Sequence, residues 1–181
     1  MGFFSELAEV VAVAAVSSVV ESVTEKSQNR LYDEKREELL ENYGAIVNHA
    51  TRNGMVDELF AFFVISIQIA ISCAASDGHI SSEERSDIDE LVHTVMSIVP
   101  ENERISFQAE INNFYKQPTQ ITELVMPAYS IADMFGLPNV DVFTNLIETI
   151  IYADGVVDSK EEIFYKTWIE KTKVIEQLLN K

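Results

Sequence analysis

Cysteine and histidine are scarce in this sequence of 181 residues, and their scarcity limits its redox and metal chemistry. Cys73 is the only cysteine, so the chain can form no intrachain disulfide and no cysteine-rich zinc site. With only three histidines, a histidine-based metal cluster is not expected either. A chain without disulfides suits a reducing compartment, and we expect a cytoplasmic protein.

Basic residues are also few, because 13 Lys and Arg face 30 Asp and Glu, giving a formal net charge of -17. A nucleic-acid-binding protein needs a basic surface to displace counterions from phosphates, so no nucleic-acid partner is expected. Docking on anionic lipid is disfavoured for the same reason. The charge instead suits cations or basic proteins as partners.

Glycine is rare as well, and the six glycines are scattered singly, which excludes the phosphate-binding glycine motifs. The nucleophile motif Gly-x-Ser-x-Gly is missing, and Cys73 lies in an apolar stretch without a nearby activating base. Carboxylate pairs leave general acid–base chemistry open, but nothing specifies a substrate. We therefore expect a protein that is not an enzyme.

The N-terminal stretch 3–23 is apolar, yet its first charges are Glu6 and Glu9, where a signal peptide would carry Lys or Arg. A membrane span would bring Glu9 and Glu21 near hydrocarbon, at roughly 3 kcal/mol for a charge at the centre. Apolar residues recur at helical spacing, namely Phe3, Leu7, Val10, Val11, Ala14, Val16, Val19, Val20 and Val23. The pattern predicts a helix packed on the rest of the chain or on a second copy, with membrane contact as the less favoured alternative.

No sustained alternating pattern indicates a strand, and the rest of the chain is typical of successive helices. Pro100 and Pro118 suit first-turn positions, Gly136 and Pro138 suit a stop, and Pro127 predicts a kink or break near Met126. The sequence thus predicts an all-α compact bundle of seven to eight helices. Beyond the N-terminal stretch, the expected ranges are 29–50, 56–75, 82–98, 101–116, 119–134, 140–153 and 159–179.

Two segments repeat with an offset of 77 residues. Asp77-Gly78 matches Asp154-Gly155, and in each copy a Glu follows the Asp by seven residues. The glycines suit the left-handed conformation that ends a helix. Ser81 and Asp158 suit the N-cap of the next helix, and with Glu84 and Glu161 at the N3 position they predict a capping box in each copy.

Each turn also brings two carboxylates together, Asp77 with Glu84 and Asp154 with Glu161. If the two units pack about a pseudo-twofold axis, these four carboxylates can converge, and such oxygen-rich clusters bind hard divalent cations. Neither copy is an EF-hand: a loop that starts at Asp77 places Ile88 where the bidentate Glu belongs. The alternative is that the turns are helix caps with solvated carboxylates.

The paired Ala-(Ser)-Asp-Gly-x-(Ile/Val)-(Ser/Asp)-x-x-Glu turns resemble the tellurite-resistance TerB-like family, which includes the N-terminal domain of a membrane-anchored DnaJ-like co-chaperone. The resemblance covers about residues 53–181 and implies a TerB-like all-helical domain there, with 1–52 as an N-terminal helical extension. It implies a metal site for a divalent cation, Ca²⁺ or Mg²⁺, at Asp77, Glu84, Asp154 and Glu161. It also implies a role in stress response or bacterial conflict without known catalysis.

Two functional hypotheses follow, from different classes. In the first, the chain is a TerB-like scaffolding module that binds a divalent cation at the acidic cluster and engages a protein partner. In the second, it is an acidic immunity or inhibitor protein that binds and neutralises a basic toxin or enzyme, with electrostatic steering to speed association.

Overall fold

The computed structural model describes residues 29–137 and 140–179, and every regular element in these ranges is helical. The predicted helix over 3–23 lies outside the described residues, as does Pro138. The all-α prediction is confirmed for the described chain. Its elements, in order, are α2 (Asn29–Asn53), α3 (Val56–Ala74), η2 (Ala75–Asp77), α4 (Ser82–Ile98), α5 (Arg104–Lys116), α6 (Ile121–Met134), α7 (Asp141–Tyr152) and α8 (Ser159–Leu179).

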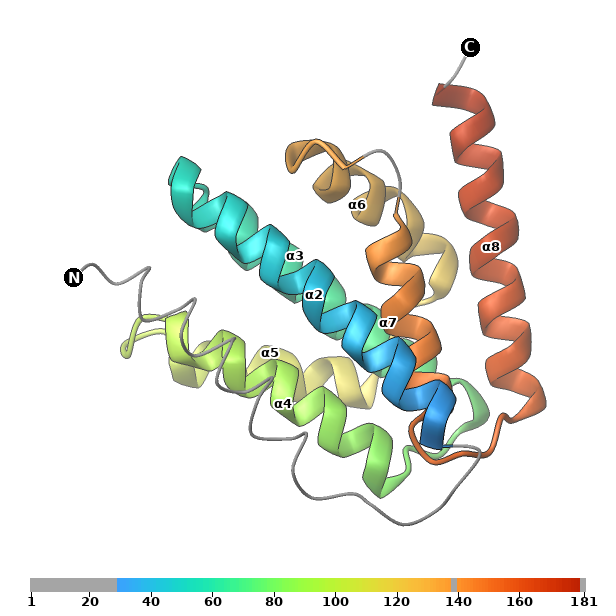
Figure 1. The fold of residues 1–181 in the computed structure, drawn as a ribbon. Coiled ribbons are helices and arrows are strands. Elements are labelled where there is room, and N and C mark those ends of the chain that lie inside the picture. Colours follow the sequence, from blue (N-terminus) through green and yellow to red (C-terminus); the bar gives the residue numbers. More distant parts are fainter. Residues whose placement is uncertain (1–28, 138–139, 180–181) are drawn as a thin grey trace.

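Helix α3 is the centre of the bundle and contacts every other described helix (Figure 1). Phe62, Ile67, Ala70 and Cys73 have no exposed surface, so the interpretation of Cys73 as a small core residue is confirmed. The length and hydropathy of the segment would also fit a membrane span, but most of its apolar surface is covered by the surrounding helices. Burial on most sides, above all in its second half, accounts for its nearly continuous apolar sequence.

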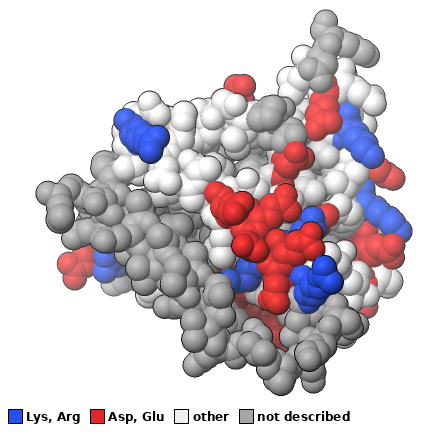
Figure 2. All heavy atoms as spheres, viewed as in Figure 1, with Lys and Arg blue, Asp and Glu red and all other residues white. Residues whose placement is uncertain are grey.

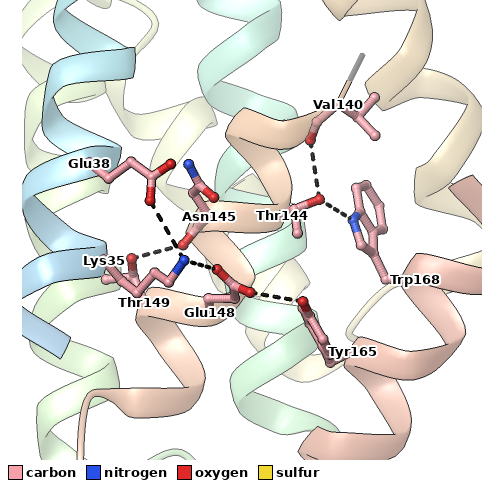
Figure 3. A network of polar contacts seen from close by, with 9 residues as sticks. All are labelled: Lys35, Glu38, Val140, Thr144, Asn145, Glu148, Thr149, Tyr165 and Trp168. Atoms are coloured by element: carbon pink, nitrogen blue, oxygen red, sulfur yellow. Dashed lines mark hydrogen bonds and ion pairs between the residues drawn. The ribbon is translucent and has the colours of Figure 1, made fainter. Parts of the chain in front are cut away.

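Helix α2 lies across the front of the bundle and packs mainly on α7 (Figure 1). Leu39, Tyr43 and Val47 belong to the same hydrophobic core as α3 and α7, so residues of the predicted N-terminal extension contribute to the core of the bundle. A polar network crosses the outer surface of this contact (Figure 3). In it, Lys35 Nζ lies 2.8 Å from Glu148, and Glu148 accepts a hydrogen bond of 2.8 Å from the Tyr165 hydroxyl of α8.

Proline placement accounts for the errors at the starts of α5 and α6. Pro100 and Pro118 lie before α5 and α6 rather than in their first turns, and the carbonyl of Pro100 instead accepts hydrogen bonds from the backbone N–H groups of Glu103 and Arg104. Of the kink or break expected near Met126, the break is wrong, because α6 continues through Pro127. Gly136, with φ +63°, follows the end of α6 as predicted.

Candidate functional site

The first Asp-Gly turn joins α3 to α4. After η2, Gly78 adopts φ +95° and its N–H donates to the carbonyl of Ala75. The Asp77 carboxylate accepts a 2.6 Å hydrogen bond from the backbone N–H of His79. Ser81 then caps α4 in a complete capping box: its hydroxyl accepts from the Glu84 N–H at 3.1 Å, and Glu84 Oε2 accepts from the Ser81 N–H at 2.7 Å. The first capping-box prediction is confirmed.

The second turn, between α7 and α8, repeats this geometry. Gly155 has φ +75°, and the Asp154 carboxylate accepts a 2.8 Å hydrogen bond from the Val156 N–H. Glu161 Oε2 accepts from the Asp158 N–H at 2.8 Å, as in a capping box. The return bond differs, because the Asp158 side chain accepts from Lys160, one residue earlier than the predicted Glu161. Both N–H groups belong to the first turn of the helix, so the cap still serves its purpose.

The two repeats meet through their glutamates. Glu84 is 4% exposed and Glu161 is 6% exposed, although both belong to the first turn of a helix. Glu84 lies close enough to Glu161 to raise the pKa of the Glu161 carboxyl group. Each uses one oxygen in its own cap, and the other oxygen of Glu84, Oε1, is buried without a hydrogen-bond donor. Such an oxygen is costly to bury, and a proton or a cation between the carboxylates would satisfy it.

The electrostatics of this pair disfavour two negative charges. Burial raises the pKa of Glu161 well above its usual value, and the neighbouring carboxylates of Glu84 and Asp154 raise it further. Burial also raises the pKa of the Cys73 thiol, again with contributions from Glu161 and Glu84, which places this thiol close to the pair. A fully buried thiol with a raised pKa is a neutral neighbour and not an activated nucleophile.

The two turns are also linked directly. Helix α8 packs on η2, and the Lys160 ammonium donates a 3.0 Å hydrogen bond to the carbonyl oxygen of Asp77, 83 positions away in the sequence. The repeats therefore lie side by side, as the pseudo-twofold hypothesis requires.

The structure brings together two of the four predicted site residues. Glu84 and Glu161 form the buried pair, and Asp154 is close enough to influence the pKa of Glu161. Asp77 is only partly exposed, but its carboxylate is engaged within its own turn. Among residues 29–137 and 140–179, no group of three or more His, Cys, Asp or Glu side chains is arranged to hold a metal ion. The full four-carboxylate cluster is thus not assembled in this conformation.

A second polar cluster, between α2 and α4, was missed by the sequence analysis. The Tyr32 hydroxyl donates to the carboxylate of Asp87 at 2.8 Å, and Arg36 donates to Glu90 at 2.7 Å. Burial raises the pKa of Asp87 to about 6. The sequence offered one indication of this cluster. Asp87 is an acidic residue that directly precedes the buried Ile88 in an amphipathic helix.

These features define an all-helical bundle with paired Asp-Gly turns that meet at a buried glutamate pair. Comparison of the chain with protein-family models, with curated proteins and with solved structures finds no match.

Proposed function

We propose that the chain is a non-enzymatic, TerB-like module that binds a divalent cation at the Glu84–Glu161 pair. The observation that carries the proposal is the buried Oε1 of Glu84, which has no hydrogen-bond donor and belongs to a residue close enough to the buried Glu161 to raise its pKa. A hard divalent cation replaces the missing donor and offsets the repulsion between the two carboxylates. Ca²⁺ and Mg²⁺ both suit carboxylate oxygens.

The two aspartates supply the rest of the proposed site. Asp154 is exposed and Asp77 partly exposed, so both lie nearer the surface than the glutamates. A cation that enters from this side meets Asp154 before Glu161. Rotation of the aspartate side chains out of their turns would complete a set of four carboxylates, at the cost of one hydrogen bond each. The ion would then link α4 to α8 and fix the surface that a protein partner contacts.

Thermal unfolding in EDTA, Ca²⁺, Mg²⁺, Mn²⁺ and Zn²⁺ at matched ionic strength tests this proposal. A ligand at 100 times its dissociation constant adds about 2.7 kcal/mol to the free energy of unfolding. We expect one ion to raise the unfolding temperature of the native chain, and Glu84→Gln to abolish that response. In EDTA the same variant is expected to be more stable than the native chain, because the amide donates to Glu161 and removes a buried charge.

Glu83→Gln is the matched control, because it removes the same charge from the adjacent, exposed position of α4. It should keep the ion response. Asp77→Asn combined with Asp154→Asn tests the outer part of the site and should weaken the response. Equal, small gains in all variants would mean that cations only screen the net charge, and the turns would then be helix caps alone.

A second candidate function, recognition of a basic partner, is favoured by the exposed face of α2. Its two central basic residues turn inward: Lys35 pairs with Glu148, and Arg36 pairs with Glu90. Its acids are left on the surface, where Figure 2 shows a continuous red patch. We name this patch the acidic ridge, and it consists of Asp33, Glu34, Glu37, Glu38 and Glu41, all exposed. An immunity or inhibitor protein that neutralises a basic toxin would use such a surface to steer association.

Capture from a lysate at low salt tests this second function. Native protein and a variant with Glu34, Glu37 and Glu41 changed to Gln are compared side by side. The hypothesis predicts one basic protein retained by the native chain, released by salt, and lost with the variant. Retention of the same proteins by both chains, or of none by either, would contradict it.

A further inference from the structure

An apolar groove opens between α2 and α4, beside the polar bridges that join the two helices. Its floor is formed by core residues of α3 and α7, including Phe63, Ala70 and Ile150. Its rim is formed by the partly exposed side chains of Leu40, Leu91 and Thr94. The groove has a volume of about 80 Å³, which is the room of two or three water molecules or of one or two small aliphatic side chains.

The walls of the groove are mainly apolar, which favours an apolar occupant. The two threonine hydroxyls in the lining are already used, since Thr94 donates to the carbonyl of Glu90 and Thr149 to that of Asn145. Arg36 and Glu90 pair with each other at one end. Two further polar groups line the groove, the Asp87 carboxylate and the Tyr43 hydroxyl, and the Tyr43 hydroxyl is buried without a hydrogen-bond partner. The rest of the wall is apolar, and aliphatic groups placed against it would remove both wall and occupant from solvent.

From these observations we propose that the apolar stripe Val16, Val19, Val20 and Val23 of the same chain covers the groove, with one or two of its valine side chains inside it. These valines recur at the i, i+3, i+4, i+7 spacing of one helix face, which is the pattern of a helix that docks in a groove. One or two valine side chains match the small volume. The occupant is thus a segment of the chain itself, and it covers the apolar surface between α2 and α4.

Chain connectivity supports this choice. Residues 24–28 join the stripe to Asn29, the first residue of α2, and five extended residues span up to about 17 Å. The groove begins along α2 at Arg36, about 10 Å from Asn29 along the helix axis. A chain that reverses direction after Val23 therefore reaches the groove. Tethering at this distance gives an effective concentration in the mM range, so weak apolar contacts are enough.

Charge argues against a second copy as the occupant. Each chain carries -17, and the acidic ridge of α2 lies on the same helix that forms one wall of the groove. Two copies that approached each other there would bring like charges together. The tethered segment also approaches the acidic ridge. Because it is covalently joined to α2, no second molecule with the same charge has to approach from solution.

Disulfide trapping in the full chain tests the proposal. Val20→Cys is combined with Thr94→Cys, and oxidation is followed by non-reducing electrophoresis and mass spectrometry. Cys73 has no exposed surface and stays out of the reaction. The matched control is Ser18→Cys with Thr94→Cys, because Ser18 has the same tether but lies on the opposite face of the predicted helix. The proposal predicts an intramolecular disulfide that forms at least about tenfold faster in the Val20 pair.

Equal rates for the two pairs would overturn the proposal, because the stripe would then not be seated on one face. Predominantly intermolecular disulfides would also overturn it, in favour of a second copy as the occupant. Leu91→Cys, one turn earlier on the rim, replaces Thr94→Cys if the first variant does not fold, and the same comparison of Val20 with Ser18 then decides.

Discussion

At the scale of single residues, burial determines which carboxylates make the stability of the protein depend on pH. Glu83 and Glu84 are adjacent in the sequence, yet only Glu84 is buried, and only Glu84 meets a partner from the other repeat. Asp87 and Asp89 show a similar contrast one turn later, because Asp87 is partly buried and Asp89 is exposed. A buried carboxylate contributes to stability in a way that depends on pH, which an exposed one does only weakly.

Asp87 gives a prediction about pH. Its pKa is raised to about 6 by burial first and then by Glu90 and Glu84, although the Tyr32 hydrogen bond and Arg36 oppose the rise. The unfolded chain has a pKa of about 3.9 at this group, so between these values the folded state binds more protons. The stabilisation by this group is therefore complete below about pH 4 and is lost as the pH rises through 6.

We expect Asp87→Asn to flatten the pH dependence of the free energy of unfolding between pH 4 and pH 7 by on the order of 1–2 kcal/mol. Urea unfolding at several pH values measures the effect. Asp89→Asn is the control, since it removes the same charge from an exposed position of α4 and should leave the slope nearly unchanged. The same slope in both variants would show that Asp87 titrates normally.

At the scale of elements, glycines occupy two kinds of backbone position in this protein, the left-handed end of a helix and the helix interior. Gly78 ends η2 with φ +95°, whereas Gly44 lies within α2 at a helical, negative φ. A Cβ added at either residue would meet no atom within 4 Å. Any difference between the two Ala substitutions must therefore come from the backbone and not from crowding.

Gly44→Ala should stabilise the protein by about 0.5–1 kcal/mol, because alanine is the better helix former. Gly78→Ala should destabilise it by about 1–2 kcal/mol, because the left-handed conformation is strained for alanine. Urea denaturation of the two single variants measures both changes. Two effects of the same sign would contradict the assigned backbone geometry.

Trp168 joins α8 to α7 through a buried contact. Its side chain is completely buried, and its indole N–H donates a 2.9 Å hydrogen bond to the Thr144 hydroxyl (Figure 3). Trp168→Phe removes this bond and leaves a small cavity, at an expected loss of about 1–3 kcal/mol in the free energy of unfolding. A double-mutant cycle with Thr144→Val should show coupling between the two residues, and additive effects would mean that the hydrogen bond contributes nothing.

At the scale of the whole molecule, the net charge of -17 opposes the compact state. Raising NaCl from about 0.01 M to 0.15 M shortens the screening length from about 30 Å to about 8 Å. We expect this change to raise the free energy of unfolding by on the order of 1 kcal/mol, because screening of long-range repulsion outweighs the loss of a few surface ion pairs. Urea unfolding at the two salt concentrations measures it, and a decrease would show that the ion pairs dominate.

The arrangement of the described helices was predictable from the sequence in outline. Helix α4 begins and ends where the hydrophobic period and the Ser81 cap placed it, and α8 matches its expected range. Several errors arose where the prediction was based on a proline. A proline can precede a helix, or lie within one when the surrounding packing compensates for the lost hydrogen bond. The candidate site was predictable as two turns whose carboxylates could converge, but the sequence did not show that the two glutamates are buried while Asp77 and Asp154 stay nearer the surface.

The sequence by itself determined the local features of this protein: its helices, its glycine turns, the caps at Ser81 and Asp158, and its negative charge. Each depends on residues within about one helical turn of one another, or on composition alone. Only the tertiary structure decided that Glu84 meets Glu161 in a buried pair, that Lys35 and Arg36 turn inward, and that an apolar groove opens between α2 and α4. These contacts join residues more than 50 positions apart, and burial, which gives them their chemistry, depends on how the helices pack.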